Sequence, residues 1–413
     1  MAASGLLEIE DARRLILSAV RPLPSEAVEL RQALGRVLGE GVSAKEAVPP
    51  FDSSAMDGFA VRAEDVAQAN GASPALLRVV DESRAGSPAS AMLGSGQAIA
   101  ISTGAMLPAG ADTVIRVEDT RRAGEEVAVL VTAAAGLDVR RAGDDVSAGQ
   151  RVLERGQALG PAELGVLASL GNELVQCVRR PRLSLLVSGD ELLAPEEPLR
   201  PGAIRDSNSV TISALARRAG ADVVKTGTVG DDADATTAAL ADATLDVDVA
   251  VICGGVSVGA HDHVRPSLEA LGAQTAFWGL ALKPGRPAWF GTLGSTLVFG
   301  LPGNPVSAMV TFVLLVGPAL RALLGVGEPL ARLTAVIERD YEKPAGRAHA
   351  VRCRMRAHED GWHVEPTGPQ GSHILTSMLG ADALAILPSQ TTAVRAGERV
   401  EIEPLHAWTG APA

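Results

Sequence analysis

Residues 249–259 read VAVICGGVSVG, an apolar run of five residues followed by paired glycines. A short apolar run that ends at turn residues is typical of a strand buried on both faces of a parallel sheet. Strand and helix patterns alternate around it from Arg182 to about Gly325, which indicates a parallel α/β domain. The expected elements are strands at 183–187, 223–228, 249–253 and 297–299 and helices at 210–219 and 232–240.

The segments on both sides of this domain have different residue patterns. Residues 43–135 hold short β-rich runs separated by Gly, Pro and Asp, which predicts an inserted β-domain. Residues 6–38 carry apolar residues at helical spacing, broken at Pro22 and Pro24, so we expect two helices there and a third after Pro161. Towards the C-terminus, strands are expected at 333–337, 350–355, 383–387 and 399–402. These strands predict a small β-barrel.

The predicted fold class is therefore α/β multidomain, with a parallel-type sheet in its central domain. At about 150 residues per domain, a chain of 413 residues has room for two to four domains. The expected domains are a discontinuous, helical and elongated N-terminal domain (1–44 plus 138–180), the inserted β-domain (45–137), the α/β domain (181–328) and a C-terminal β-barrel-like domain (329–413).

Composition excludes several classes of protein. The formal charge is −12 and only eleven residues are aromatic, so the chain lacks the basic, stacking surface of a nucleic-acid binder. Three cysteines without a close pair fit a reducing compartment, and the acidic start of the chain does not resemble an export signal. The most apolar stretch, 306–320, is shorter than a membrane span of about 20 residues. We expect a cytoplasmic protein that binds neither nucleic acid nor membrane.

Glycine-rich loops follow the expected strands. In an open parallel sheet, ligands bind outside the carboxyl ends of the strands, so these loops are the first candidates for a site. Paired glycines let backbone amides approach an anion, and a helix that begins Asn304-Pro305 presents unpaired N–H groups, so a phosphate would suit this edge. The alternative is that the glycines only make tight turns between strands and helices. The loops are 188–192, 254–259 and 300–305.

Carboxylates crowd the same edge: Asp190, Glu191, Asp231, Asp232 and Asp262. Carboxylates repel a phosphate unless a hard cation such as Mg²⁺ lies between them, so the pattern indicates an Mg²⁺-assisted phosphate site. The alternative for Asp231, Asp232 and Asp262 is that they cap helices after a glycine turn.

Two further patterns concern histidine and lysine. The pair His261 and His263 is a poor candidate for a transition-metal site, because side chains two residues apart diverge on a helix. The chain has only four lysines, and Lys283 lies in the turn Lys-Pro-Gly-Arg-Pro, where it could bind an oxyanion or simply face solvent.

Three segments together resemble the family of MoeA-type molybdopterin molybdotransferases and the gephyrin E-domain. They are PFDSSAMDGFA (50–60), GGVSVG (254–259) and GLPGNPVSA (300–308), and segments 102–108, 202–208 and 371–377 support them. The resemblance extends over essentially the whole chain. It implies a homodimeric, Mg²⁺-dependent transferase whose central domain binds molybdopterin. Its substrates would be adenylylated molybdopterin and molybdate, and its products the molybdenum cofactor and AMP.

The resemblance also implies roles for individual residues. The catalytic set would be Asp57, Thr103, Glu191, Asp231, Asp262 and Lys283. Asp231 and Asp262 would bind Mg²⁺, and Lys283, Arg352 and Ser372 would bind molybdate. The residues expected to bind the pterin substrate are Gly189, Asp190, Asp206, Ser207, Asn208, Gly254, Gly255, Val256, Ser257, Pro302, Gly303, Asn304 and Pro305.

Two positions depart from the family pattern. Family members often carry a second lysine where Gly279 stands and an acidic residue where Ala260 stands, with Arg286 as a candidate substitute for the lysine. Two alternative functions stay open at this point. One is molybdopterin adenylyltransferase, because the GGVS loop is shared with that class, and the other is a pterin-binding scaffold that docks partner proteins. Other enzymes of molybdenum cofactor biosynthesis are candidate partners.

Overall fold

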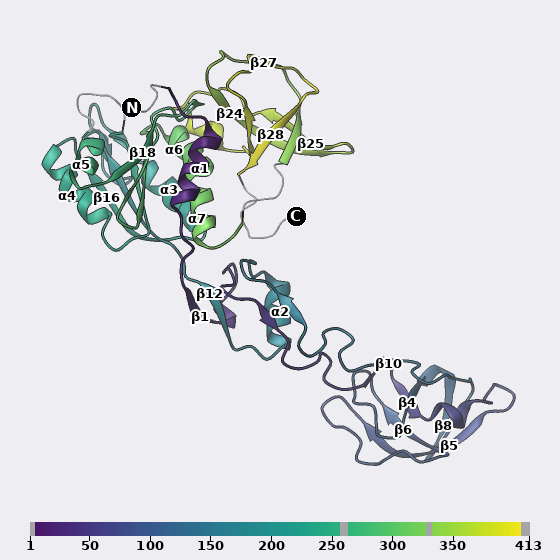
Figure 1. Ribbon diagram of the computed structural model, residues 1–413. Coiled ribbons are helices and arrows are strands. Elements are labelled where there is room, and N and C mark those ends of the chain that lie inside the picture. The colour runs from purple at the N-terminus through teal and green to yellow at the C-terminus, as the bar shows by residue number, and fades with distance from the viewer. Residues whose placement is uncertain (1–4, 257–262, 328–332, 406–413) are drawn as a thin grey trace. The chain divides into compact units, whose positions relative to one another are not determined.

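The computed structural model describes residues 5–256, 263–327 and 333–405 (Figure 1). The chain divides into two compact units, each described by itself below. Unit 1 comprises residues 1–40, 155–164 and 174–413, and unit 2 comprises residues 41–154 and 165–173.

A six-stranded sheet forms the centre of unit 1, in the order β16-β13-β17-β21-β20-β18. Its strands are β13 (Arg182–Ser188), β16 (Asp222–Val229), β17 (Val249–Cys253), β18 (Gln274–Trp278), β20 (Trp289–Leu293) and β21 (Thr296–Leu301). The four strands from β16 to β21 are parallel, which confirms the predicted α/β domain. The strands β18 and β20, which the sequence analysis did not anticipate, pair antiparallel with each other, and β20 pairs antiparallel with β21.

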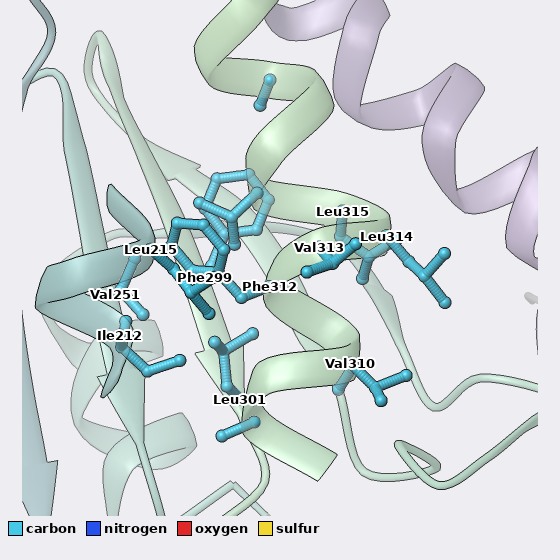
Figure 2. Close-up of a cluster of buried hydrophobic side chains, with 14 of the residues drawn as sticks. Ile212, Leu215, Val251, Phe299, Leu301, Val310, Phe312, Val313, Leu314 and Leu315 are labelled. Atoms are coloured by element: carbon cyan, nitrogen blue, oxygen red, sulfur yellow. The ribbon is translucent and has the colours of Figure 1, made fainter. Parts of the chain in front are cut away.

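Helices cover both faces of this sheet (Figure 1). They are α1 (Ile9–Ala19), α3 (Asn208–Arg218), α4 (Ala233–Ala243), α5 (Val264–Ala270) and the continuous run α6 (Pro305–Thr311), η4 (Phe312–Val316) and α7 (Gly317–Leu323). Alternate strand residues point to opposite faces. Val251 therefore packs with α1, α3 and the α6–α7 run, whereas Ile252 packs with α4 and α5. Figure 2 shows the first of these cores, where Ile212 and Phe312 meet strand residues.

The α6–α7 run is long and apolar enough to cross a membrane by length and composition. However, 83% of its most apolar window is buried inside the protein. Residues 312–316 form one π-helical turn, and all five of their side chains are buried. This run is thus a buried core helix.

The C-terminal part of unit 1 is a closed sheet. Its strands are β22 (Leu333–Ile337), β24 (Ala348–His358), β25 (Gly361–Pro366), β26 (Ala383–Leu387) and β28 (Arg399–Pro404). They pair in the order β24-β25-β22-β28-β26, and β26 pairs back with β24, so the predicted barrel is confirmed. The two-residue strand β19 (Leu282–Lys283) joins the barrel at β24. Shorter elements of unit 1 are β14 (Leu192–Leu193), β15 (Ile204–Arg205), β23 (Tyr341–Glu342), η5 (Leu375–Met378) and β27 (Ala393–Val394).

Unit 2 contains the predicted inserted β-domain. Its main sheet has the order β7-β4-β6-β5-β9-β8 and encloses a small core around Phe59 and Val127. The strands are β4 (Gly58–Val61), β5 (Ala75–Ser83), β6 (Gln97–Ile101), β7 (Thr113–Arg116), β8 (Thr120–Ala123) and β9 (Glu126–Val129). Two-stranded pairs join β2 (Val42–Ser43) to β11 (Arg151–Leu153) and β3 (Ser53–Ser54) to β10 (Val139–Arg140). The 3₁₀ turns are η2 (Ala63–Val66) and η3 (Val117–Asp119).

One predicted helix near the N-terminus is wrong. The first helix, α1, and the later helix α2 (Pro161–Ser169) form as expected. The segment after Pro24 instead forms β1 (Ser25–Glu29), which pairs antiparallel with β12 (Leu174–Val178), and the turn η1 (Leu30–Gln32). Pro22 and Pro24 prevent the helix that ends at Ala19 from continuing, and the distant strand β12 then satisfies the backbone of β1. A helix-like spacing of apolar residues could not reveal that partner.

Candidate active site

The loops after the parallel strands meet at one edge of the sheet. Gly189 donates a backbone hydrogen bond to Val229 O at 3.1 Å, and Gly254 donates one to Leu301 O at 3.0 Å. The loops after β17 and β21 touch, because a Cβ built on Gly303 would lie 3.7 Å from the Cα of Gly254. The prediction that these loops share one edge is confirmed.

The paired glycines of the loop after β17 are required by their backbone. Gly254 and Gly255 have φ angles of +92° and +65°, which L side chains rarely adopt. A Cβ on Gly254 would lie 2.5 Å from Ser188 O, and one on Gly255 would lie 2.5 Å from Val264 Cγ2. Close packing against the end of β13 for Gly254 and against α5 for Gly255 therefore explains both glycines, whether or not a phosphate binds there. Val256, the next residue, is buried against Gly300.

A buried amide crosses this edge. Asn208, at the start of α3, is 6% exposed and donates from Nδ2 to Gly303 O at 2.7 Å. Its Oδ1 is buried and accepts no hydrogen bond within the described part of the chain. An unsatisfied buried acceptor costs about 1–3 kcal/mol, so this oxygen is a position where a bound donor would be stabilised. Ser207 precedes α3, and the buried Asp206 accepts from Ser209 N at 3.0 Å.

The acidic residues of the edge have different tasks. Asp232 Oδ1 accepts from Ala235 N at 2.7 Å and so caps α4. Asp190 Oδ1 accepts from Asp231 N at 3.1 Å, which joins the loops after β13 and β16. Asp190, Glu191 and Asp231 are exposed and offer carboxylate oxygens, the donors that a hard cation prefers.

The other half of the predicted metal pair cannot be placed. Asp262 and Ser257 lie outside the described residues, as does the departure at Ala260. The helix α5 begins at Val264 with His263 at its N-cap, and the His263 side chain makes no capping hydrogen bond.

The barrel contributes a buried cation. Arg352, on β24, has no exposed surface and donates from Nε to Ser377 Oγ at 3.1 Å. Its Nη2 donates to Pro369 O at 3.3 Å and Gly371 O at 3.2 Å. Its Nη1 is buried and has no acceptor within the described part of the chain. Burial lowers the pKa of Arg352, but an arginine stays charged at neutral pH.

The segment that Arg352 binds lies against the loop after β21. Ser372 O accepts a hydrogen bond from Val306 N, in the first turn of α6, at 3.2 Å. The predicted molybdate residues Arg352 and Ser372 therefore lie near the Pro302–Pro305 segment that was predicted to bind the pterin. Lys283 is exposed and pairs with His349 of β24 through the backbone of β19.

Two predicted residues of unit 2 also come together. Thr103 N donates to Asp57 Oδ1 at 2.8 Å, and both residues are exposed. Asp57 O accepts from Val117 N at 3.1 Å, which holds the 50–60 segment against the sheet of this unit. The pair was expected from the resemblance, and its role in catalysis remains a proposal.

Comparison with known proteins identifies the family. Three family profiles match: "MoeA N-terminal region (domain I and II)" over residues 7–171, "Probable molybdopterin binding domain" over 184–322 and "MoeA C-terminal region (domain IV)" over 334–405. The chain belongs to the MoeA family. It is accordingly an enzyme of the transferase kind that acts in molybdenum cofactor biosynthesis.

Relatives of this MoeA-family chain match it along almost its full length. Molybdopterin molybdenumtransferase 2 of Mycobacterium tuberculosis is 36% identical over 95% of this chain and 98% of the relative. Molybdopterin molybdenumtransferase of Haemophilus influenzae is 35% identical over 98% of this chain and all of the relative. The solved structure of the molybdopterin biosynthesis MoeA protein from Pyrococcus horikoshii is 31% identical and superposes with a TM-score of 0.84, covering 98% of this chain and 100% of that one.

The MoeA-type resemblance led us to expect a second lysine at Gly279. Gly279 has a φ of +88°, and a Cβ there would lie 3.0 Å from Leu6 Cδ2. Its carbonyl accepts from Leu7 N at 3.1 Å, so the N-terminal segment covers it. This backbone favours glycine. Arg286 lies close by, since Leu280 N donates to Arg286 O at 2.8 Å, and its role as substitute remains a prediction.

Two buried residues of this MoeA-family enzyme, His349 and Lys343, lie near the proposed oxyanion site but belong to no motif that predicted them. His349 is 5% exposed, and burial first, then the charges of Lys283, Lys343 and Arg347, lower its pKa to about 4. Lys343 is 6% exposed, donates to Arg347 O at 2.9 Å and has a pKa lowered by burial. The scarcity of lysine was the one sequence signal that could have pointed to Lys343. The positive charges of Lys283, Lys343 and Arg347 make this corner of the barrel electropositive, and burial together with these charges keeps the imidazole of His349 neutral.

Protonation of His349 should destabilise the enzyme in acid. Between about pH 6.5 and pH 4 the unfolded chain binds a proton at this histidine and the folded chain does not, so stability is lost as pH falls through that window. The His349→Gln variant, which cannot titrate, should lose less stability than the wild type between pH 7 and pH 4.5. Urea unfolding at several pH values measures this, and parallel pH profiles for the two proteins would contradict the assignment.

Proposed function

We propose that this enzyme inserts molybdate into adenylylated molybdopterin and releases AMP and the molybdenum cofactor in an Mg²⁺-dependent reaction. The observation that carries the proposal is the guanidinium of Arg352, which is fully buried and leaves Nη1 without an acceptor among the described residues. A buried cation with an unused donor is stabilised by an anion. The names of the relatives support molybdenum chemistry, and molybdate is an anion of the required kind.

In this proposal the barrel binds the oxyanion. Arg352, Ser372 and Lys283 would donate to molybdate oxygens, and the neutral His349 would not add a third positive charge to those of Arg352 and Lys283. The contact between Ser372 and Val306 holds this pocket next to the loops proposed to bind the pterin. Holding two reactants side by side lowers the entropic part of the activation barrier.

The sheet edge would bind the adenylylated pterin. Asn208 Oδ1 can accept from a substrate donor, and the closely packed loops at Gly189, Gly254 and Gly303 form the floor beneath it. The remaining residues proposed for substrate binding are those of the resemblance: Asp190, Asp206, Ser207, Gly255, Val256, Ser257, Pro302, Asn304 and Pro305. Glu191, Asp57 and Thr103 remain proposed catalytic residues.

The exposed acids of the edge fit Mg²⁺. The side chain of Asp231 is not needed to cap α4, because Asp232 is the capping residue. The backbone N–H of Asp231 donates to Asp190 Oδ1, which fixes the position of Asp231. Asp231 and Asp262 would hold the ion. When bound, Mg²⁺ would neutralise charge on the phosphoanhydride that is broken.

The test is AMP release from adenylylated molybdopterin, with Mg²⁺, in the presence and absence of molybdate. We expect release that depends on molybdate and stops with a chelator. Pterin binding without AMP release would contradict the proposal and favour a scaffold. Pyrophosphate release from ATP and molybdopterin would favour the alternative adenylyltransferase.

Substituting Asp231 and Asp232 one at a time should distinguish the residue that binds the metal ion from the residue that caps α4. Asp231→Asn is expected to lower molybdate-dependent AMP release about tenfold or more, with unchanged thermal unfolding, since it removes a metal ligand. Asp232→Ala is expected to cost about 1 kcal/mol of stability through loss of the cap, with turnover nearly unchanged. Initial rates and melting curves of the two variants measure this. Equal losses of rate in both would refute the division of tasks.

Three further features belong to the proposal. We propose a homodimer, on the basis of the family resemblance, and multi-angle light scattering would test it. We propose a cytoplasmic location, supported by the buried, unpaired thiols of Cys177, Cys253 and Cys353. We also retain the domain limits 1–44 plus 138–180, 45–137, 181–328 and 329–413, which limited proteolysis would test.

A further inference from the structure

Three potential metal ligands meet at one end of the C-terminal barrel. Glu338 directly follows β22, His358 is the last residue of β24 and His363 lies in β25. The backbone fixes their register, because Glu338 N donates to Val364 O at 2.9 Å and β24 and β25 form a hairpin that turns between His358 and Gly361. Three strands therefore bring these side chains together from positions up to 25 residues apart.

The separations suit a common ion. His358 Nε2 lies 3.4 Å and His363 Nδ1 lies 3.6 Å from the same carboxylate oxygen, Glu338 Oε1. One potential ligand atom from each residue falls within 4.8 Å of the others. Two atoms bound to one tetrahedral zinc ion at about 2.1 Å are roughly 3.4 Å apart. The imidazole rings are stacked with their centroids 3.9 Å apart and their planes 18° apart, so their in-plane lone pairs are nearly parallel and the side chains must rotate to direct both nitrogens at one ion.

A fourth residue orients the inner histidine. His363 Nε2 lies 2.9 Å from Asp360 Oδ1, and because an ionised carboxylate can only accept, the ring donates this hydrogen bond from Nε2–H. In the neutral ring, Nδ1 then presents its lone pair to Glu338. A carboxylate that fixes the tautomer of a ligating histidine is the usual outer partner in zinc sites.

We propose that Glu338, His358 and His363 bind a borderline transition-metal cation such as Zn²⁺, with Asp360 as a positioning residue. Protons on the two rings could satisfy each nitrogen–oxygen pair separately, whereas one metal ion would bind both histidines and the carboxylate together. Two nitrogens and one oxygen select zinc-like ions over Mg²⁺, which prefers oxygen ligands. The side chain of His358 is 45% exposed, so an ion can enter, and a fourth position remains for water.

This site is separate from the proposed transferase centre. His358 lies six residues from Arg352 along β24, about 20 Å at the usual rise of a strand. Bound metal would join the end of β22 to the β24–β25 hairpin and so stabilise the barrel, because a ligand of the folded state raises its stability.

The test is calorimetric titration of the chelator-treated full-length protein with ZnCl₂, together with visible spectra after loading with Co²⁺. We expect one site per chain of micromolar or tighter affinity and the absorption of a tetrahedral Co²⁺ complex. The variants His358→Ala, His363→Ala and Glu338→Gln should each lose about tenfold or more in affinity, and the Co²⁺ spectrum with it. Asp360→Asn should weaken binding about 10–100-fold and alter the Co²⁺ spectrum.

Two controls make the result specific. Glu359→Gln changes an exposed carboxylate in the same hairpin and should bind zinc as the wild type does. A double variant, His261→Ala with His263→Ala, should also retain the ion. Melting of each metal-free variant checks that it folds, and the exposed His358 is the substitution least able to disturb the barrel. Zinc binding that is absent in the wild type, unaffected in His358→Ala, or lost only in the double variant would overturn the proposal.

Discussion

Replacing Arg352 by lysine is expected to reduce molybdate-dependent AMP release about a hundredfold, mainly through a higher KM for molybdate. Lysine keeps the charge but cannot reproduce the planar set of donors that binds Ser377, Pro369 and Gly371 and leaves Nη1 for an anion. Losing one partner of a buried charged hydrogen bond costs about 2–5 kcal/mol, and 2.8 kcal/mol corresponds to about a hundredfold in binding. Initial rates at varied molybdate concentration measure the effect.

A matched control is available on the same strand. Arg356 lies four residues further along β24, and its side chain is 60% exposed and only 3.7 Å from Glu365 Oε2. Arg356→Lys should leave both KM and stability unchanged, because exposed ion pairs contribute little. The two melting curves show how much of the Arg352→Lys effect is structural. An unchanged KM for molybdate in a folded Arg352→Lys protein would remove Arg352 from the oxyanion pocket.

Replacing Gly254 by alanine should have the largest effect on stability. The φ of +92° costs an L residue about 1–2 kcal/mol, and the new Cβ would lie 2.5 Å from Ser188 O, a backbone atom that cannot move without shifting β13. We expect a loss of about 3 kcal/mol, together with about a hundredfold weaker pterin binding, because the loops of β13 and β17 must separate. Chemical unfolding and titration with pterin measure the two effects.

A Gly272→Ala variant distinguishes the cost of the backbone conformation from the cost of the steric contact at position 254. Gly272 has the same φ of +92°, but a Cβ there meets nothing within 4 Å. Gly272→Ala should therefore show only the conformational cost, about 1 kcal/mol, and normal pterin binding. If the two alanine variants lose equal stability, the contact with Ser188 is not what requires glycine at position 254.

Local patterns predicted most of this fold because each expected strand carries its own signal. The run 249–253 is apolar throughout and becomes β17, which is buried on both faces. The strands of the barrel and the inserted domain were found in the same way. The hairpin of β18 and β20 was missed, since Trp289–Leu293 follows a turn rich in Pro and Gly and has no alternation that marks a strand.

The candidate site was predictable where the motif itself carries the chemistry. The glycine loops and the acids follow directly from strands whose carboxyl ends share an edge, so Gly254, Asp190 and Asp231 could be placed together in advance. The sequence does not tell which of Asp231 and Asp232 caps α4 and which is available to a metal ion, because either side chain can reach the first turn of α4. Only the hydrogen bond from Ala235 N decides for Asp232.

The sequence by itself determined the α/β domain, the two β-domains and the family, because buried strands, glycine turns and motifs are properties of short, contiguous segments. The tertiary structure decided what depends on partners distant in the chain. It made residues 25–29 a strand by pairing them with 174–178, lowered the pKa of His349 by burying it among cations, and joined Glu338 to His358 and His363. Such features arise from packing and from the electrostatics of burial, which no local pattern encodes.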